Sequence, residues 1–425
     1  MEGRSVSLQP PGFGGREVHI PSHRSLIPTL ADGCERGGAW AVWLAFDAIV
    51  VPTIRGADTL IEAGRLAAET DCPLLVLCSG HRIDSRRALS VLAEVPGLVR
   101  VTAVDYTSSH LSIEAADLLR FRTDEQPEAL EGRNNDVSAK RNLALLVARM
   151  MGWEALLFLD DDVRDVPEEV RCERGGVLQR TWHALETHPA MEAVGWAFPG
   201  AREVGADPLG LSGAPRLSTS DNSMVCHAAR LVGIEQDTFI GAGALAVRVG
   251  PATPFFPNVY NEDWLFLFDL VVRKAVALAG ELTQLPYDPF EPPDTGFRQE
   301  FGDVLAEGLF RLLHEHGSLT DAEQVPYWRD VVAMRRALID WILDRLQVPA
   351  ARGSSKERAT ARRVQQRLGV ARKRIRAEGL PEALAAYVRA WRQDVDTWSG
   401  VMTGLPELDH LDKALVWLGL DPHSR

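Results

Sequence analysis

Short apolar runs alternate with amphipathic stretches along the first third of the chain. Strands are predicted at three apolar, partly β-branched runs, residues 48–51, 74–78 and 99–104. Pro52 is expected to end the first of them. Apolar positions at helical spacing predict helices between these strands, at residues 58–69 and 84–92. This alternation predicts a parallel sheet with crossover helices, in which ligands bind beyond the carboxyl ends of the strands.

The alternation continues with a helix and a strand that leads directly into three aspartates. Ser138 is expected to cap a helix that ends near Met151, and Gly152 stands where a helix C-terminus favours glycine. The run Ala155–Leu159 (ALLFL) predicts a buried strand. Further elements are predicted as strands at residues 192–198 and 244–249 and as a helix at residues 262–276.

The pattern changes near both ends of the chain. Residues 1–40 are rich in Pro, Gly and polar residues, whereas beyond residue 300 the strand signal fades and residues 320–425 show helical periodicity. We therefore expect an irregular leader at residues 1–45, an α/β domain at 46–300 and a helical domain at 301–425. Residues 352–376 hold ten basic residues against one acid, Glu357, and are interpreted as a solvated helical face or as a surface for a phosphate-bearing partner.

Composition narrows the class of protein. With 425 residues, 46% hydrophobic and 25% charged, the chain resembles an ordinary globular protein. A net charge of −13 argues against nucleic acid as a partner of the whole chain. The sequence has no apolar run of about 18 residues and no signal-peptide pattern, so we expect a cytoplasmic protein without a transmembrane segment. Five scattered cysteines argue against a disulfide framework or a zinc site.

Asp160, Asp161 and Asp162 directly follow the predicted ALLFL strand. Three adjacent carboxylates repel one another unless a cation lies among them, and oxygen ligands select hard ions such as Mg²⁺ or Mn²⁺. Mg²⁺ takes one or two protein carboxylates and completes its shell with substrate phosphates. The triplet therefore indicates either a metal–diphosphate site or a solvated acidic turn.

Three metal chemistries compete for this acidic string. A dehalogenase-type phosphatase motif would open its fold and would not carry Arg164, and the terpene-synthase motif DDxxD (residues 161–165) belongs to all-helical proteins. The third is the DxD motif of GT-A glycosyltransferases, which follows a nucleotide-binding β-α-β half. The predicted strands favour this third interpretation.

Several motifs in order resemble GT-A-fold, family-2-like nucleotide-sugar glycosyltransferases over residues 46–275. They are the opening strand with Pro52, Thr53 and Arg55, the helix start Ser138–Asn142, the DxD strand, the segment Gly241–Ala246 and the pair Glu262-Asp263. The resemblance implies a Rossmann-like, mostly parallel mixed sheet flanked by helices, followed here by the C-terminal helical region. It also implies a nucleotide-diphosphate sugar donor, an acceptor that the sequence does not identify, and Mn²⁺ or Mg²⁺ as cofactor.

The resemblance also implies roles for individual residues. Asp162, with Asp160, would hold the metal, while Asp161 would face the ribose. Donor binding is expected from Pro52, Thr53, Arg55, Lys140, Arg141, Asp160 and Asp161. Asp263, with Glu262 beside it, would serve as the catalytic base of an inverting transfer. His227, His314 and His316 are candidates for a further metal ligand.

One position departs from the family pattern, and two other functions stay open. The second strand ends in Cys78-Ser79-Gly80, where members of the family place an aspartate against the nucleoside, so Ser79, Asp84 or Asp105 would take that role. A weaker likeness, which includes residues 201–207, is to the reversibly glycosylated polypeptides, which are nucleotide-sugar mutases. A catalytically inactive GT-A scaffold is the third hypothesis.

Overall fold

A computed structural model of the chain describes residues 25–30, 46–127, 136–164, 177–198, 223–234, 240–285 and 288–424. Most of the expected leader, residues 1–45, and the stretch at residues 201–207 lie outside these described ranges. Among the described residues, no helix is long and apolar enough to cross a membrane.

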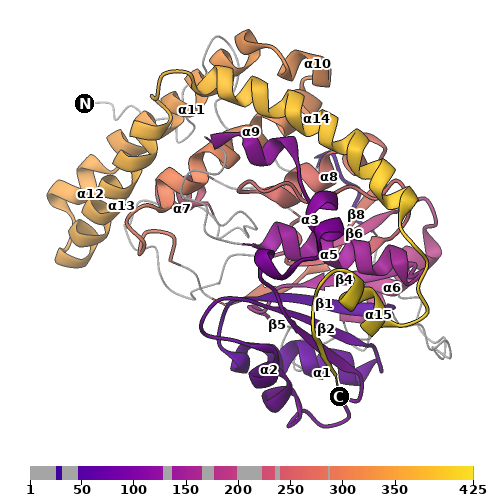
Figure 1. Ribbon diagram of the computed structural model, residues 1–425. Coiled ribbons are helices and arrows are strands. Elements are labelled where there is room, and N and C mark those ends of the chain that lie inside the picture. Colours follow the sequence, from indigo (N-terminus) through magenta and orange to yellow (C-terminus); the bar gives the residue numbers. More distant parts are fainter. Residues whose placement is uncertain are drawn as a thin grey trace, which may run out of the picture.

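An eight-stranded mixed sheet forms the centre of the molecule (Figure 1). Its spatial order is β10-β3-β2-β1-β4-β7-β6-β8. Neighbouring strands run parallel except at β7, which is antiparallel to both β4 and β6, and at β10, which is antiparallel to β3. The strands are β1 (Ala48–Thr53), β2 (Leu74–Cys78), β3 (Val101–Asp105), β4 (Ala155–Leu159), β6 (Ala193–Ala197), β7 (Ala244–Arg248), β8 (Val276–Glu281) and β10 (Pro422–Ser424). The predicted α/β class with a mostly parallel mixed sheet is confirmed.

Helices cover both faces of the sheet and create two hydrophobic cores. Alternate residues of β1 point to opposite faces, so that Val50 joins one core and Ile49 the other. The core with Ile49 is covered by α1 (Ile61–Glu69), α2 (Ser85–Leu92) and α6 (Val177–Thr187). The larger core with Val50 lies under α5 (Val137–Met150), α7 (Met224–Leu231), α8 (Glu262–Val272) and the C-terminal helices. Figure 1 shows α1 and α2 on one side of the sheet and α5, α9 and α14 on the other.

The C-terminal part is helical, as predicted, and belongs to the larger core. Its elements are α9 (Thr295–His314), α10 (Leu319–Ala322), α11 (Val325–Arg345), α12 (Gln347–Arg352), α13 (Ser355–Arg374), α14 (Leu380–Gly404) and α15 (Leu411–Trp417). Residue 300, the expected domain boundary, lies inside α9, and Phe266 of α8 shares a core with Ile339 and Trp391. The chain then returns to the sheet as β10, a strand that the sequence analysis did not predict.

Much of the basic stretch at residues 352–376 is paired within the protein. Arg363 lies 2.8 Å from Asp288, and Arg372 and Arg376 both contact Asp340. Arg367 donates hydrogen bonds to the carbonyl oxygens of residues 290 and 291. These contacts favour the interpretation of α13 as a structural helix with a solvated face.

Pro52 does not end β1, contrary to the prediction. Proline has no N–H group to donate, but at this position β1 needs no donor, because no described strand pairs with the edge of β1 that faces β4 beyond Val50. Ile49 donates to the carbonyl of Pro73 and Ser79 donates to the carbonyl of Thr53, so the odd-numbered residues of β1 bond toward β2. Pro52 therefore points its nitrogen toward β4, and the pairing of β1 with β4 ends already at Val50. The strand continues along β2 as far as Thr53.

The helix predicted at residues 262–276 is too long. α8 ends at Val272, and Lys274 adopts a left-handed conformation (φ 57°) that reverses the chain into β8. The start of α5 also differs from the prediction. Asp136 is its N-cap residue, and the Ser138 hydroxyl instead donates to the carbonyl oxygen of Pro257. Gly152 has the positive φ (66°) that was expected at the other end.

The remaining short elements connect these layers. The helix predicted at residues 58–69 is a 3-10 turn, η2 (Ala57–Leu60), followed by α1. Beyond β3 the chain forms η3 (Ser108–His110), α3 (Ile113–Leu118) and η4 (Arg122–Glu125). Directly after the three aspartates, β5 (Val163–Arg164) pairs with β9 (Thr283–Gln284).

Candidate functional site

The three aspartates lie at the switch point of the sheet. From β1 the chain builds β2 and β3 on one side and then crosses to place β4 on the other side. Such a switch point leaves a crevice outside the carboxyl ends of the two strands, and α/β proteins bind ligands there. The carboxyl end of β1 carries Pro52, Thr53 and Arg55, and that of β4 carries Asp160, Asp161 and Asp162.

A pocket of about 230 Å³ occupies this crevice. Nine of the eleven residues predicted for the site line it: Pro52, Thr53, Arg55, Lys140, Arg141, Asp160, Asp161, Asp162 and Glu262. Ile54, Asp136 and Val137 complete its lining. None of the three candidate histidines is among these lining residues. Segments more than 200 residues apart in the sequence therefore meet around one acidic pocket.

Arg55 joins the second and third aspartates. Its Nη1 lies 2.6 Å from Asp161 Oδ1 and 2.7 Å from Asp162 Oδ2. Thr53 Oγ1 donates to the other oxygen of Asp161 at 2.6 Å, and Gln284 Nε2 donates to Asp162 Oδ1 at 3.0 Å. Both aspartates are buried, whereas 44% of the Arg55 side chain is exposed. The guanidinium thus lies between two buried carboxylates on the solvent side of the pocket.

Arg141 joins the first aspartate to the predicted catalytic pair. Its Nη2 lies 2.7 Å from Asp160 Oδ1 and its Nη1 lies 2.8 Å from Glu262 Oε1. The side chain is buried, and its guanidinium lies 5.4 Å from the centre of the Phe256 ring. Burial raises the pKa of Asp160 to about 6. Attraction by Arg141 lowers this pKa, and repulsion by Asp162 and Asp161 raises it further.

Asp263 lies behind Glu262, against the backbone of the segment Gly241–Ala246. Its Oδ2 accepts a hydrogen bond from the Ala242 amide at 3.0 Å, and a Cβ at Gly241 would lie 2.8 Å from the same oxygen. Glycine at position 241 therefore gives the carboxylate room. Burial raises the pKa of Asp263 to about 7, with repulsion from Glu262 as the next cause and attraction by Arg141 opposing both. A carboxyl group with this pKa exchanges a proton near neutral pH.

Lys140 has a structural position beneath the pocket. Its Nζ donates to the Thr53 carbonyl at 2.9 Å and to Ser79 Oγ at 2.6 Å, and it lies 2.9 Å from Asp136. The side chain is 1% exposed, and burial lowers its pKa against the attraction of Asp136. An ammonium group has three protons. Each proton of Lys140 Nζ can serve one of the three contacts, which together hold the carboxyl ends of β1 and β2 against α5.

A larger pocket of about 570 Å³ adjoins the first, and Asp136 lines both of them. Ser79, the residue expected in place of the family aspartate, lines this larger pocket. The two alternatives are engaged at the start of α2, where Asp84 accepts from the Arg87 amide and Asp105 accepts from both the amide and the hydroxyl of Ser85. Of the three candidates, Ser79 is therefore the residue that the structure brings to the pocket.

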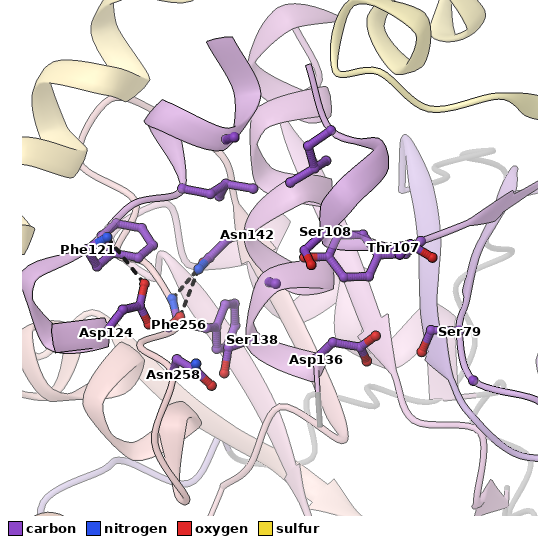
Figure 2. A pocket seen from close by; sticks show the side chains of 16 residues that line it. Ser79, Thr107, Ser108, Phe121, Asp124, Asp136, Ser138, Asn142, Phe256 and Asn258 are labelled. Carbon is purple, nitrogen blue, oxygen red and sulfur yellow. Dashed lines mark hydrogen bonds between the residues drawn. The ribbon is translucent and has the colours of Figure 1, made fainter. Parts of the chain in front are cut away.

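Figure 2 shows polar and aromatic side chains that line the larger pocket together. Tyr106, Phe121 and Phe256 supply the apolar surface, and Asp136 and Ser79 face one side of the cavity. The opposite side holds Asp124, whose carboxylate accepts from the Phe121 amide, and Asn258. Such a lining combines flat apolar surface with hydrogen-bonding groups, a combination typical of pockets for small organic ligands.

Carboxylates and guanidinium groups gather around the smaller pocket. Five carboxylates, from Asp160, Asp161, Asp162, Glu262 and Asp263, lie together with the two guanidinium groups of Arg55 and Arg141. Among the described residues, no group of three or more His, Cys, Asp or Glu is arranged so that it could hold a metal ion. A Mg²⁺ ion needs only one or two protein carboxylates when substrate phosphates supply other ligands. By themselves the described side chains therefore do not form a metal site, and a metal here would need ligands from a bound molecule.

The sequence analysis did not identify several residues of the site. Asp136 links the two pockets, Gln284 bonds Asp162, and Phe256 packs against Arg141. Of these residues, Asp136 could most easily have been predicted from the sequence, because an acid four residues before Lys140 at a helix start indicates an ion pair. Gln284 and Phe256 reach the site only through tertiary structure.

Fold and site together define the class: an α/β protein with an acidic pocket at the switch point of a mostly parallel mixed sheet. Comparison with models of known protein families finds no match for this chain, and no curated protein matches it. The function therefore has to be argued from the pocket itself.

Proposed function

We propose that the chain is a metal-dependent glycosyltransferase that moves a sugar from a nucleotide-diphosphate sugar to an acceptor hydroxyl. One observation carries the proposal: nine residues selected from scattered motifs line a single pocket at the switch point of the sheet. The mostly parallel mixed sheet agrees with the GT-A architecture that those motifs imply.

The two adjoining pockets suit the two halves of such a donor. The acidic pocket offers guanidinium groups and a place for a cation beside a diphosphate. The larger pocket, with Tyr106, Phe256 and Ser79, offers apolar surface and hydrogen bonds for a nucleoside. Asp136 lines both and marks where the two parts of the ligand would join.

Asp160 and Asp162 are the residues that would hold Mn²⁺ or Mg²⁺. Asp161 and Asp162 are engaged alike, since Asp161 accepts from Thr53 and Arg55 and Asp162 accepts from Gln284 and lies against Arg55, so a metal on Asp162 would require Arg55 to move. A bound divalent ion would stabilise the negative charge that develops on the departing diphosphate. Arg55, released from the aspartates, would then reach the phosphate oxygens from the open side of the pocket.

Asp263 is the proposed base. Its neighbour Glu262 contacts Arg141, which also contacts Asp160, and these contacts connect the start of α8 to the proposed donor site. The acceptor oxygen forms a bond to the anomeric carbon as the bond from that carbon to the diphosphate oxygen breaks. The acceptor proton goes to Asp263, and the nucleoside diphosphate leaves with the bonding electrons. A pKa near 7 supports this role, because such a carboxylate both accepts the proton and later releases it to water.

Incubation with a panel of nucleotide sugars and Mn²⁺, followed by measurement of nucleoside diphosphate release, tests the proposal. We expect release from at least one donor and a loss of about 100-fold or more in Asp162→Ala, from removal of a charge-stabilising ligand. Asp412→Ala, at an exposed acid of α15, is the matched control and should retain full activity.

The alternatives give different products. A nucleotide-sugar mutase of the reversibly glycosylated polypeptide type would change the sugar ring form without releasing diphosphate. An inactive scaffold would neither bind nor hydrolyse any donor. Either result would refute the transferase proposal.

A further inference from the structure

A buried ionic cluster joins α9 to α11 at a distance from the pockets. Arg335 of α11 contacts three acids on successive turns of α9: Glu300 and Glu307 at 2.7 Å and Asp303 at 2.9 Å. All four residues are at least nine-tenths buried. Burial of such charges is costly, so that a cluster of this kind is a weak source of stability. A cluster of this kind can instead fix one arrangement of the chain.

The cluster continues to the start of α8. Asp303 uses one oxygen for Arg335, and its other oxygen accepts a hydrogen bond of 2.9 Å from Asn261 Nδ2. Asn261 immediately precedes Glu262 and Asp263 and has a left-handed backbone (φ 64°, ψ 39°), a conformation that asparagine tolerates better than most residues. Its side chain makes no cap bond to α8 itself. The side chain therefore ties the first turn of α8 to α9 rather than to its own helix.

The backbone of α9 lies unusually close to the same turn. A Cβ added at Gly302, the neighbour of Asp303, would lie 2.1 Å from the carbonyl oxygen of Tyr260. Only glycine permits this approach without displacement of the turn. Two independent features of α9, a glycine and a clamped carboxylate, thus fix residues 260 and 261.

We propose that Asn261, Asp303 and Arg335 form a positioning relay, in which the C-terminal helices hold the turn that places Glu262 and Asp263. The proposal rests on the catalytic role proposed for that pair. Arg335 donates to one oxygen of the Asp303 carboxylate and thereby orients it. The other oxygen of Asp303 accepts from the Asn261 side-chain amide, and this bond holds Asn261, the N-cap residue of α8, in place. In this position Glu262 forms an ion pair with Arg141, and Asp263 accepts a hydrogen bond from the Ala242 amide. None of the three relay residues lines either pocket.

Asn261→Gly is the most direct test, because glycine keeps the left-handed backbone and removes only the side-chain anchor. Lys274→Gly is the matched control: Lys274 is also left-handed (φ 57°) but follows the other end of α8. We expect Asn261→Gly to lower kcat by about 10- to 100-fold with little change in donor KM, since a misplaced base affects the chemical step. The control should match the wild-type protein in both constants.

A pair of exchanged residues separates positioning from general destabilisation. Asn261→Asp places two carboxylates against each other, and Asp303→Asn weakens the hold of Arg335, so each alone should lower kcat. The double variant Asn261→Asp/Asp303→Asn again has one amide and one carboxylate at this contact. Because the double variant still lacks the ion pair between Arg335 and Asp303, we expect only partial recovery: kcat should lie above that of Asn261→Asp and no lower than that of Asp303→Asn, a non-additive result that marks the two residues as coupled.

Hydrogen exchange of the amides at residues 262–265 tests the relay even without a known donor. We expect exchange about tenfold faster or more in Asn261→Gly and unchanged exchange in Lys274→Gly. Equal protection in Asn261→Gly and wild type, or equal loss in both glycine variants, would overturn the relay. A wild-type protein that releases no nucleoside diphosphate would instead refute the proposed function, while the exchange experiment would still decide the relay.

Discussion

Arg141 provides the sharpest test of the site's electrostatics. The side chain is 3% exposed and lies within 2.8 Å of two carboxylates, Asp160 and Glu262. Arg141→Met removes the charge and leaves a side chain of similar length. Removal of one partner from a buried ion pair costs about 3–5 kcal/mol, because the remaining charge is left uncompensated. We expect a loss of this size in the free energy of unfolding at pH 8.

The loss should depend on pH in a defined direction. With Arg141 present, the pKa of Asp160 is already raised to about 6 by burial, and without Arg141 it should rise further. A folded-state pKa above the unfolded value of about 4 means that the folded protein binds the proton more tightly. Stability therefore falls as pH rises from about 4 toward the folded-state pKa. At pH 5 the Asp160 carboxyl group of Arg141→Met is largely protonated, so the loss should be smaller than at pH 8.

Urea denaturation at the two pH values measures both effects. Arg149→Met is the matched control, since Arg149 also lies on α5 but bonds through Nε to the carbonyl oxygen of Met402. We expect the control to lose about 1 kcal/mol, a typical value for one hydrogen bond, at either pH. Equal losses in the two variants, or a loss in Arg141→Met that is the same at pH 5 and pH 8, would refute the reasoning.

Three further predictions concern the base, the donor site and the support of the larger pocket. For Asp263, whose pKa is about 7, kcat should rise with pH up to about 7 and then level off, and Asp263→Asn should lower the plateau about 100-fold or more; a flat wild-type profile would exclude this base. Arg55→Ala should weaken binding of nucleoside diphosphate about tenfold while Mn²⁺ alone binds more tightly, both measured by calorimetry, because Arg55 Nη1 occupies the place between two carboxylates. Asp394 of α14 accepts from the amides of Arg122 and Thr123 and from the Thr123 hydroxyl, so Asp394→Ala should cost about 2–4 kcal/mol in urea denaturation, whereas the exposed Asp396→Ala should cost almost nothing.

The strands beneath the site could be predicted because each is buried on both faces. β2 and β4 have the bounds expected from their apolar runs, since such strands contain almost no polar residue that would obscure the ends. β10 could not be found in this way. It has the sequence PHS, lies at the edge of the sheet and is only partly buried, so its pairing with β3 leaves no hydrophobic pattern.

The residues that line the site could be selected from sequence, but their contacts could not. Lys140 is an example, because the resemblance implied that it binds the donor. In the structure it is buried and bonds to Thr53, at the end of β1, and to Ser79, the residue after β2. Only the packing of α5 over β1 and β2 brings these atoms together, and nothing local in the sequence encodes that packing.

The contacts of the segment Gln299–Asp303 could not be predicted from the sequence either. In the sequence it is a conspicuous mixture of acidic, aromatic and small residues without an evident role. In the structure its acids meet Arg335, more than 30 residues away, and Asp303 extends the contact to the residue before Glu262. A catalytic pair on α8 that depends on α9 and α11 requires the C-terminal helices to fold together with the sheet. A fragment that ends near residue 300 would cut α9 and lose Arg335, so it should lack the ordered first turn of α8 even if its sheet forms.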